Sequence, residues 1–437
     1  MAKKTKAANL SIEEKLEQAL IVPGYEPYKI PDNWCWTNLK TVCNLDNGIK
    51  HNNESLVYFD AKTLREITEP VSRNSGVIVE KGQKVILVDG ENSGEVFVIP
   101  DRGYMGSTFR ILNISKQFDE MYIRYFIDIF REELKKNKIG SAIPHLNKEL
   151  FYGLQFPLPP LSEQQRIVER IESLFSKLDE AKEKAQEVIN SFETRKAAIL
   201  HKAFSGELTA KWREENGVGI ESWERKRISE CCKLGSGGTP SRKKPNYYTG
   251  DIPWIKTGEI NWNTVNYSEE SITQEAIDNS SAKVYAPGAV LVAMYGMGIT
   301  RGKAAILGIE AATNQAVCVL QPKGYLFNRY LYFFFMCNYW DIREQAVGGN
   351  QLNLSATIIG KLNIDIPNLE EQYVITELLD SIIEKEYQTK QIAESVIDQI
   401  DAMKKAILAR AFRGELGTND PKEESAVELL KQILSGE

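Results

Sequence analysis

The stretch "VLVAMYGMGITRGKA", which ends at Ala304, combines an apolar run with glycines, a threonine, an arginine and a lysine. These residue types bind phosphate when their spacing is right. A P-loop needs Ser or Thr after its Gly-Lys pair, but Ala304 follows Lys303, and Met297 stands where the first glycine belongs. A dinucleotide-binding turn needs a third glycine where Arg301 stands. The sequence therefore predicts a turn between strands here, and no nucleotide site.

The cysteines and histidines of the chain lack the spacing that metal binding requires. The six cysteines form no Cys-x-x-Cys pair, and the three histidines, His51, His145 and His201, lie in unrelated settings. This spacing predicts neither a metal site nor a disulfide framework. No Ser-His-Asp order, nucleophile elbow or pair of catalytic carboxylates stands out, although the acidic residues are numerous. We therefore expect no catalytic residues, no metal and no cofactor.

A different chemistry is suggested by "KLGSGGTPSRKKPNYYTGDIPWIKTGEI", Lys233 to Ile260. Small residues let a backbone approach phosphate closely, hydroxyls donate to phosphate oxygens, and clustered cations attract them. The alternative is a solvated turn whose aromatic residues are buried, and for Trp254 we expect the core. The candidate DNA-binding residues here are Ser236, Gly237, Gly238, Thr239, Ser241, Arg242, Lys243, Lys244, Tyr247 and Lys256.

Two amides further along the chain add to this group. Asn314 and Gln315 in "EAATNQAV" can each make paired hydrogen bonds to adenine in the major groove, although amides in a turn often have a structural role only. In the first half of the chain, "NGIKHNNES" and "SRNSG" are expected to be polar loops. They contribute the candidate DNA-binding residues Lys50, His51, Asn52, Arg73 and Asn74.

The elements that must position these residues are written twice. "RKAAILHKAFSGEL" near the middle of the chain is echoed by "KKAILARAFRGEL" near its end, and "PPLSEQQRIV" is echoed by "PNLEEQYVIT". Gly206 and Gly414 are separated by the same distance as Leu161 and Leu369, so these stretches match without a gap. The chain is therefore expected to repeat one plan, a variable globe followed by a long helix.

Apolar residues in both repeats follow alternating steps of four and three, which is a heptad stripe. The stripe consists of Ile167, Ile171, Leu174, Leu178, Ala181, Ala185, Val188 and Phe192 in the first copy, and of Ile375, Leu379, Ile382, Ala393, Val396, Ile400, Met403 and Ile407 in the second. Ser162 is expected to cap the first helix with Gln165 completing a capping box, and Gly206 and Gly414 are expected to end the two helices.

Two related stripes most simply pack on one another about a two-fold axis, which makes the helices antiparallel and turns them into a spacer of roughly 65 Å. The alternative is that each helix packs only on its own globe or on another subunit. We expect an α+β fold: two mixed α/β globes joined by two long helices in an antiparallel coiled coil, with pseudo-two-fold symmetry.

Composition bounds the class of protein. The 437 residues exceed what one core usually holds, and the N-terminus lacks the apolar segment and cleavage site of a signal peptide. The most apolar run, "YLYFFFMCNYW", is too short to span a bilayer and is read as a buried helix. A soluble cytoplasmic protein is expected. The net charge of −6 argues against nucleic acid as a partner, but the cations are concentrated locally.

Together these motifs resemble the specificity subunit of a type I restriction-modification system, over nearly the whole chain. The resemblance rests on both helix starts and ends quoted above, on "GSGGTPSR", "GDIPWIKTGEI" and "ATNQAV", and on "GGNQLNLS" before the second helix. In the first globe the Gly-Gly-Thr-Pro loop is absent, and "GSTFRI" replaces "TNQAV".

The resemblance implies that each globe reads half of an asymmetric bipartite site in double-stranded DNA. The helices would set the spacer and dock two methyltransferase subunits, motor-nuclease restriction subunits would join the complex, and the chain itself would perform no chemistry. The expected domains are an N-terminal helical arm (1–29), target-recognition domains (30–160 and 210–368), a central helix (161–209), and a C-terminal helix with its tail (369–437). The alternative function is a coiled-coil scaffold with two protein-binding globes.

Overall fold

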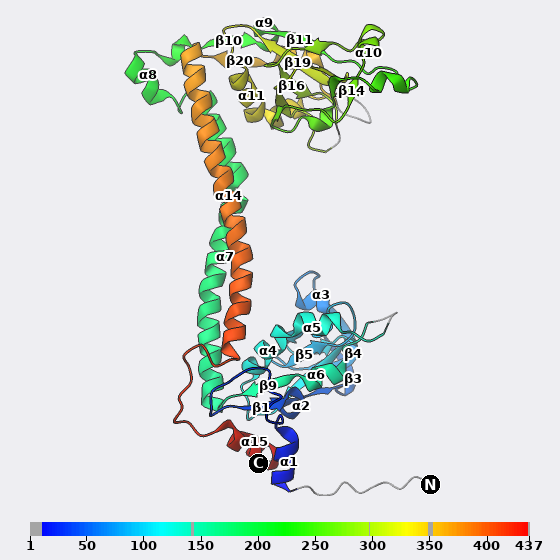
Figure 1. Cartoon of the computed structure of the whole chain (residues 1–437), viewed down its shortest axis with the longest axis vertical. Coiled ribbons are helices and arrows are strands. Elements are labelled where there is room, and N and C mark those ends of the chain that lie inside the picture. The colour runs from blue at the N-terminus through cyan, green and yellow to red at the C-terminus, as the bar shows by residue number, and fades with distance from the viewer. Residues whose placement is uncertain (1–10, 141–143, 297, 348–352, 436–437) are drawn as a thin grey trace. The chain divides into compact units, whose positions relative to one another are not determined.

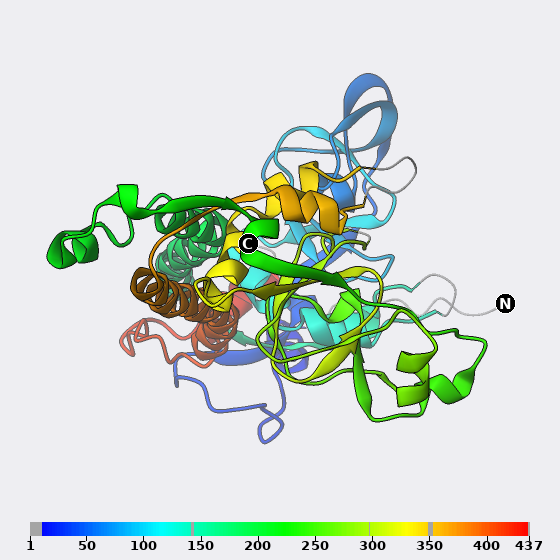
Figure 2. The same ribbon diagram turned by 90° about the horizontal axis from the view of Figure 1, so that it is seen from above.

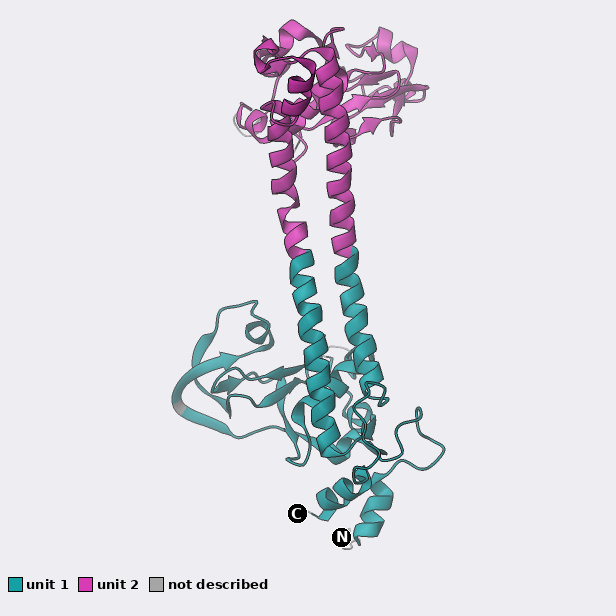
Figure 3. Cartoon of the chain, turned by 90° about the vertical axis from the view of Figure 1, so that its left-hand side faces the viewer, with its two compact units in different colours: residues 1–185, 395–437 teal, residues 186–394 magenta. Residues whose placement is uncertain are grey.

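A computed structural model of the chain describes residues 11–140, 144–296, 298–347 and 353–435 (Figure 1). The chain divides into two compact units, residues 1–185 with 395–437 (unit 1) and residues 186–394 (unit 2), as Figure 3 shows. Each unit contains one globe together with stretches of both long helices, α7 (Leu161–Phe204) and α14 (Leu369–Ala411).

The globe of unit 1 mixes short helices and strands. Its strands are β1 (Cys35–Asn38), β2 (Cys43–Asp46), β3 (Lys50–Phe59), β4 (Val71–Val79), β5 (Lys84–Leu87), β6 (Val96–Val98), β7 (Gly103–Met105), β8 (Phe109–Ile114) and β9 (Gln155–Leu158). Its helices are α1 (Ile12–Ala19), α2 (Leu39–Val42), α3 (Ala61–Leu64), α4 (Glu120–Ile129), α5 (Arg131–Lys136) and α6 (Lys148–Gly153), and α15 (Ala426–Ser435) packs on α1.

The globe of unit 2 has the same kinds of element. Its strands are β10 (Glu224–Arg227), β11 (Cys232–Ser236), β12 (Ile252–Ile255), β13 (Thr264–Val265), β14 (Ser271–Ile272), β15 (Val284–Tyr285), β16 (Val290–Ala293), β17 (Ala304–Leu307), β18 (Ala311–Thr313), β19 (Val317–Pro322) and β20 (Asn363–Ile366). Its helices are α8 (Ala210–Asn216), α9 (Ile228–Cys231), α10 (Gln274–Asp278), α11 (Asn328–Cys337), α12 (Tyr339–Glu344) and α13 (Ala356–Lys361), with short 3-10 turns η1 (Ile220–Ser222), η2 (Pro245–Tyr248) and η3 (Thr257–Glu259).

The two globes share a framework and differ in what is added to it. In unit 1 the sheet order is β2-β8-β5-β6 and β1 pairs with β9; in unit 2 the order is β11-β19-β16-β17-β13 and β10 pairs with β20. The added part is the closed set β3-β4-β7 in unit 1 and a separate sheet, β14-β12-β18-β15, in unit 2. This is the part of the repeat where the sequences differ in length and content. The expected repetition of two mixed α/β globes is confirmed.

Each core joins its globe to the long helices. In unit 1, Ile167 and Ile171 of α7 are fully buried against α4 and the strands around it, in a cluster that includes Tyr122 and Phe126. In unit 2, Ile375 and Leu379 of α14 are buried in the equivalent way. The core of unit 2 also buries Tyr330–Phe335 of α11, so the first part of the apolar run is a buried helix. The rest of the run differs from the expectation, because α11 ends at Cys337 and Trp340 of α12 is 66% exposed.

The long helices lie side by side and antiparallel within each unit (Figures 1 and 3). In unit 1, Asp179 of α7 forms an ion pair with Lys404 of α14, and Lys182 forms one with Asp401. The residue numbers of the partners on α14 therefore decrease as those on α7 increase. In unit 2, Phe192 stacks on Tyr387 at 4.9 Å, and Arg195 bonds Glu386 at 2.8 Å, again in descending order. The expected antiparallel pairing is confirmed.

The burial of side chains along α7 and α14 agrees only in part with the predicted heptad stripe. Ile167, Ile171, Ala185, Phe192, Ile375, Leu379, Ala393 and Ile400 are buried, whereas Leu174, Leu178, Val188, Ile382, Val396 and Ile407 are half-buried. Ala181 and Met403 are exposed, and Ile383 is buried in place of Ile382. A strict heptad drifts around a straight α-helix, so a single stripe does not hold one face over more than forty residues.

The helix ends confirm one expectation and correct another. Gly206 and Gly414 follow the helices with φ of 81° and 72°, the left-handed conformation that glycine adopts without strain. Ser162, however, lies inside α7 rather than capping it, and its hydroxyl bonds Glu423 at 2.7 Å. In α14, Asn368 performs the capping role by accepting the Glu371 N–H at 2.8 Å.

Candidate nucleic-acid interface

The candidate residues of unit 2 converge where three strands end. The N–H of Gly238, just after β11, donates to the carbonyl of Thr313 at the end of β18, at 2.9 Å. The N–H of Asn314 donates to the carbonyl of Ile255 at the end of β12, also at 2.9 Å. The segment 236–239, Lys256 and the amide pair 314–315 are therefore brought to one edge of the globe.

The two glycines of this edge have a packing role. Both are buried, and a Cβ on Gly237 would lie 1.9 Å from the Thr313 carbonyl oxygen, while one on Gly238 would lie 2.3 Å from the backbone nitrogen of Ala282. The loop crosses the neighbouring backbone too closely for a side chain. The fold alone thus explains both glycines, and a role in contacting DNA stays a prediction.

Two of the predicted cations are engaged within the protein. Arg242 lies over the Tyr248 ring at 4.0 Å and pairs with Glu270 at 2.7 Å, and Lys256 bonds Glu270 at 3.0 Å and Glu269 at 2.9 Å. The hydrogen bond from Arg242 lowers the pKa of the Glu270 carboxyl, and the two carboxylates raise the pKa of Lys256. These contacts hold the two cations in place and put the acidic groups of Glu269 and Glu270 beside them.

The remaining cations of the loop are exposed. Lys243 and Lys244 both face solvent, and the ammonium of Lys244 donates to the Tyr247 hydroxyl at 2.8 Å. Tyr247 is buried, like Trp254, whose expected place in the core is confirmed. The Tyr247 ring therefore packs inside the globe beneath the loop, and it is not exposed for stacking on a DNA base.

The other polar candidates in unit 2 differ in their exposure and in the hydrogen bonds they already make. Ser236, Thr239 and Ser241 are exposed. Gln315 is exposed at the tip of its turn, whereas the side-chain amide oxygen Oδ1 of Asn314 accepts the Ala316 N–H at 3.1 Å. The Asn314 amide therefore has its NH₂ group left to offer.

The candidates of unit 1 lie on strands, which corrects the expectation of polar loops. Lys50, His51 and Asn52 begin β3, and Arg73 and Asn74 lie in β4, where His51 is opposite Gly76 and Asn52 is opposite Ser75. All five side chains are exposed. A strand pair that is solvated lacks the apolar alternation by which a strand is recognised, so composition alone indicated a loop.

Three of these five line one hollow. Lys50, Asn52 and Arg73 face a pocket of about 400 Å³, together with Tyr58 and Arg110, which the sequence did not single out. His51 and Asn74 are not among its lining residues.

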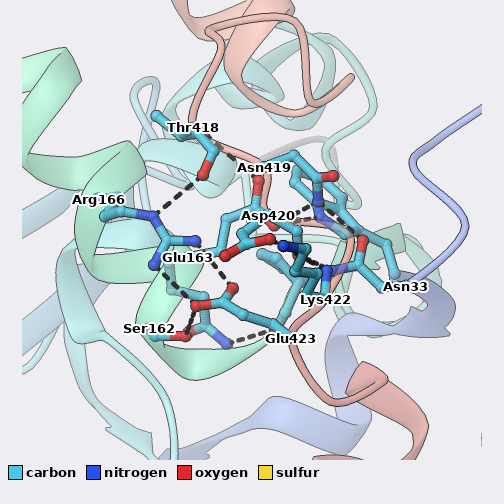
Figure 4. A network of polar contacts seen from close by, with 12 residues as sticks. Asn33, Ser162, Glu163, Arg166, Thr418, Asn419, Asp420, Lys422 and Glu423 are labelled. Atoms are coloured by element: carbon cyan, nitrogen blue, oxygen red, sulfur yellow. Dashed lines mark hydrogen bonds and ion pairs between the residues drawn. The ribbon is translucent and has the colours of Figure 1, made fainter.

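A buried carboxylate at the start of each long helix was also not foreseen. In unit 1, Glu163 is fully buried and accepts the indole N–H of Trp34 at 2.7 Å and the Asn419 amide at 2.8 Å. Figure 4 shows this cluster, in which the chain after α14 is fastened to α7. There Arg166 makes two bonds to Glu423, at 2.9 and 2.8 Å, and lowers the pKa of that carboxyl.

Unit 2 repeats the arrangement with different partners. Glu371 is fully buried and accepts the indole N–H of Trp223 at 2.9 Å, the Thr209 hydroxyl at 2.7 Å and the Arg213 guanidinium at 2.7 Å. The sequence did carry a signal for these buried carboxylates, namely a Glu-Gln pair at the same place in both repeats. The glutamines of the two pairs, Gln164 and Gln372, are fully buried as well. Each side-chain oxygen accepts the backbone N–H of the residue that precedes a helix of its globe, Asp119 before α4 and Phe327 before α11.

Within residues 11–140, 144–296, 298–347 and 353–435, no cluster of three metal-binding side chains occurs. None of the helices in the same ranges combines the length and apolar character needed to cross a bilayer. All six cysteines are free thiols.

The chain is similar in sequence to known proteins over most of its length. The family described as type I restriction modification DNA specificity domain matches residues 31–191 and 220–396. The specificity subunit of the type I restriction enzyme MjaVIII from Methanocaldococcus jannaschii is 26% identical over 363 residues, 78% of this chain and 81% of that protein. The EcoKI specificity subunit of Escherichia coli K12 is 20% identical over 437 residues, 89% of this chain and 90% of the relative.

Solved structures show the same fold. A chain from a study of complex assembly and conformational transition of the type I R-M system aligns with a TM-score of 0.68 at 20% identity, over 89% of this chain and all of that one (100%). The HsdS subunit from Thermoanaerobacter tengcongensis aligns with a TM-score of 0.62 at 20% identity, over 89% and 99%. The chain belongs to the type I restriction-modification DNA specificity family, as its repeated motifs suggested.

Proposed function

We propose that this chain is the DNA specificity subunit of a type I restriction-modification complex, and that each globe reads one half of a bipartite DNA site. The observation that carries the proposal is that the two globes share the same framework sheets but differ in the strands added to them, β3-β4-β7 in unit 1 and β14-β12-β18-β15 in unit 2. The buried Trp–Glu bond at the helix start is the same in both units, whereas the added strands and their exposed polar residues differ. Two globes that read different half-sites need this combination.

We propose residues 30–160 and 210–368 as the two target-recognition domains, residues 161–209 as the central spacer helix, and residues 369–437 as the C-terminal spacer helix with its tail. Residues 1–29 are proposed as an N-terminal helical arm, and the described part of this segment contains α1. The candidate DNA contacts in each globe are those given above, with Arg242 and Lys256 shared between DNA and the acidic pair Glu269 and Glu270.

The proposed partners are double-stranded DNA, two methyltransferase subunits and motor-nuclease restriction subunits. Exposed apolar side chains on α14 support a protein partner on the helices: Tyr373, Tyr387, Ile392 and Met403 are between 41% and 65% exposed. Apolar surface of this kind commonly marks a contact with another protein. The chain itself is proposed to perform no chemistry and to leave catalysis to the partner subunits.

A domain exchange tests the proposal. Residues 223–365 are replaced by the matching segment of a relative that recognises another site, and methylated sequences are mapped genome-wide in a host that carries the complex. One half-site should change while the other and the spacer stay as they are. A change in both half-sites, or in neither, would refute independent reading by two globes.

A further inference from the structure

Strands β3 and β4 of unit 1 form an arch whose two ends are attached to one strand. They pair antiparallel along most of their length, and β7 pairs with residues 57–59 at the end of β3 and with residues 77–79 at the end of β4. The pair therefore curls away from β7 between these attachments, and the register shift between Asn52 and Leu56 adds to the bend. Figure 2 shows the arch as the blue ribbon that curls outward.

The hollow under this arch has the character of an anion-facing surface. It measures about 400 Å³, and its lining residues include Lys50, Arg73 and Arg110 as well as the amides of Asn47 and Asn52. None of its described lining residues is acidic. This differs from the edge of unit 2, where Glu270 neutralises the nearby cations.

Arg73 differs from the other arginines of its globe in that its guanidinium has no hydrogen-bond acceptor and no ionic partner within the described part of the chain. Its guanidinium lies over the Tyr58 ring, with Cζ 3.4 Å from the ring centre, and the side chain is exposed. The other arginines between residues 30 and 160 all have an acceptor or an ionic partner, namely Arg65, Arg102, Arg110, Arg124 and Arg131. Arg73 has none among the residues that the structure describes.

We infer that the β3–β4 arch enters the DNA major groove and that Arg73 reads a guanine there. The inference rests on the proposed function. The major groove admits a two-stranded β-ribbon, and a guanidinium held flat by a ring matches the two acceptors, O6 and N7, that guanine presents. Asn52, beside Arg73 in the hollow, contacts an adjacent base, and Lys50 and Arg110 face the phosphates.

Methylation mapping of single variants tests the inference in the assembled complex. Arg73→Ala should make one G·C position degenerate in the half-site read by unit 1, with discrimination at that position falling roughly tenfold to a hundredfold. Arg73→Lys should restore only part of it, since an ammonium lacks the planar fork. Arg131→Ala is the matched control, because it removes the same charge from the same globe outside the hollow and should leave the sequence unchanged.

The outcomes separate this inference from the function on which it rests. If the native complex methylates a bipartite site and Arg73→Ala leaves every position intact, or weakens methylation equally at all sequences, the arch does not read a base. If the native complex shows no sequence preference, the proposed function itself fails. Equal melting temperatures of the Arg73→Ala and native chains exclude unfolding as the cause of a changed sequence.

Discussion

Individual acidic residues decide how much of the positive charge is available to DNA. In unit 2, Glu270 accepts from Arg242 and Lys256 at once, so it competes for the donors that a phosphate would use. Surface ion pairs of this kind contribute little to stability, and their larger effect is on binding.

We therefore expect Glu270→Gln to tighten sequence-independent DNA binding by the assembled complex. Within the described ranges, Arg242 loses its only carboxylate partner, and Lys256 keeps only Glu269. The salt dependence should also steepen, by about one unit of slope for each new phosphate contact. Binding to a non-cognate duplex is measured over a salt series. The control Glu344→Gln changes net charge equally at an exposed position, and an identical result for both variants would show that Glu270 does not restrain the cations.

The buried carboxylates at the helix starts should differ in what their loss costs. Glu163→Ala leaves the Trp34 indole N–H without an acceptor and removes one of the two acceptors of the Asn419 amide, which should lower the free energy of unfolding of unit 1 by about 1–3 kcal/mol. Glu371→Ala also leaves the buried charge of Arg213 unpaired, which should cost unit 2 about 3–5 kcal/mol.

Denaturant unfolding followed by circular dichroism checks this order. Glu169→Ala and Glu377→Ala change exposed residues on the same helices and serve as controls. Equal losses for Glu163→Ala and Glu371→Ala would mean that the Arg213 charge is not held by Glu371.

Residue types indicated the DNA-binding segments, but the use of each side chain could not be predicted from them. The loop 241–244 was recognisable as cationic, yet the pairing of Arg242 with Glu270 joins residues that are distant in sequence. Tyr247 and the two glycines of the loop have packing roles that only the crossing of backbones shows. Glu163 and Glu371 looked like two surface acids among many.

At the scale of elements, the long helices were predictable because a heptad stripe repeats over many turns. Their ends at Phe204 and Ala411 agree with the glycines that follow them. Strands β3 and β4 were not predictable, since their polar composition is that of a loop and their pairing depends on β7. An element whose two faces are solvated carries no periodic signal.

The burial of Ile383 in place of Ile382 in α14 can be tested by comparing alanine variants of these two residues. Ile383→Ala removes a buried side chain, 7% exposed, from the core of unit 2 and should lower its free energy of unfolding by about 2–4 kcal/mol. Ile382→Ala changes a half-buried neighbour and should cost less than about 1 kcal/mol. Chemical denaturation of the two variants decides between the registers, and a larger loss for Ile382→Ala would restore the stripe expected from the sequence.

At the scale of the whole molecule, the repeat predicted the frame of both globes but not their additions. The framework sheets have matching strand orders, whereas the inserted strands form different sheets. This agrees with the proposed function, in which the shared framework sheets hold each globe on the helices and the added strands contact the DNA bases.

If the paired helices set the distance between half-sites, lengthening both should lengthen the recognised spacer. One heptad inserted after Ala185 in α7 and one after Glu394 in α14 preserve the antiparallel register and add about 10 Å. On B-DNA this is about three base pairs at roughly 3.4 Å each. An insertion in α7 alone is the control: it puts the stripes out of register and should abolish specific methylation, and an unchanged spacer in the double insertion would exclude the helices as its determinant.

The most direct test of the central claim is a genome-wide map of methylated bases in a host that carries this chain with its methyltransferase subunits, compared with the same host lacking the chain. Two globes on one helical frame predict methylation at a single asymmetric motif, made of two short specific sequences separated by a fixed number of unspecified base pairs. A continuous motif, a variable gap, or the same methylation without the chain would contradict the account.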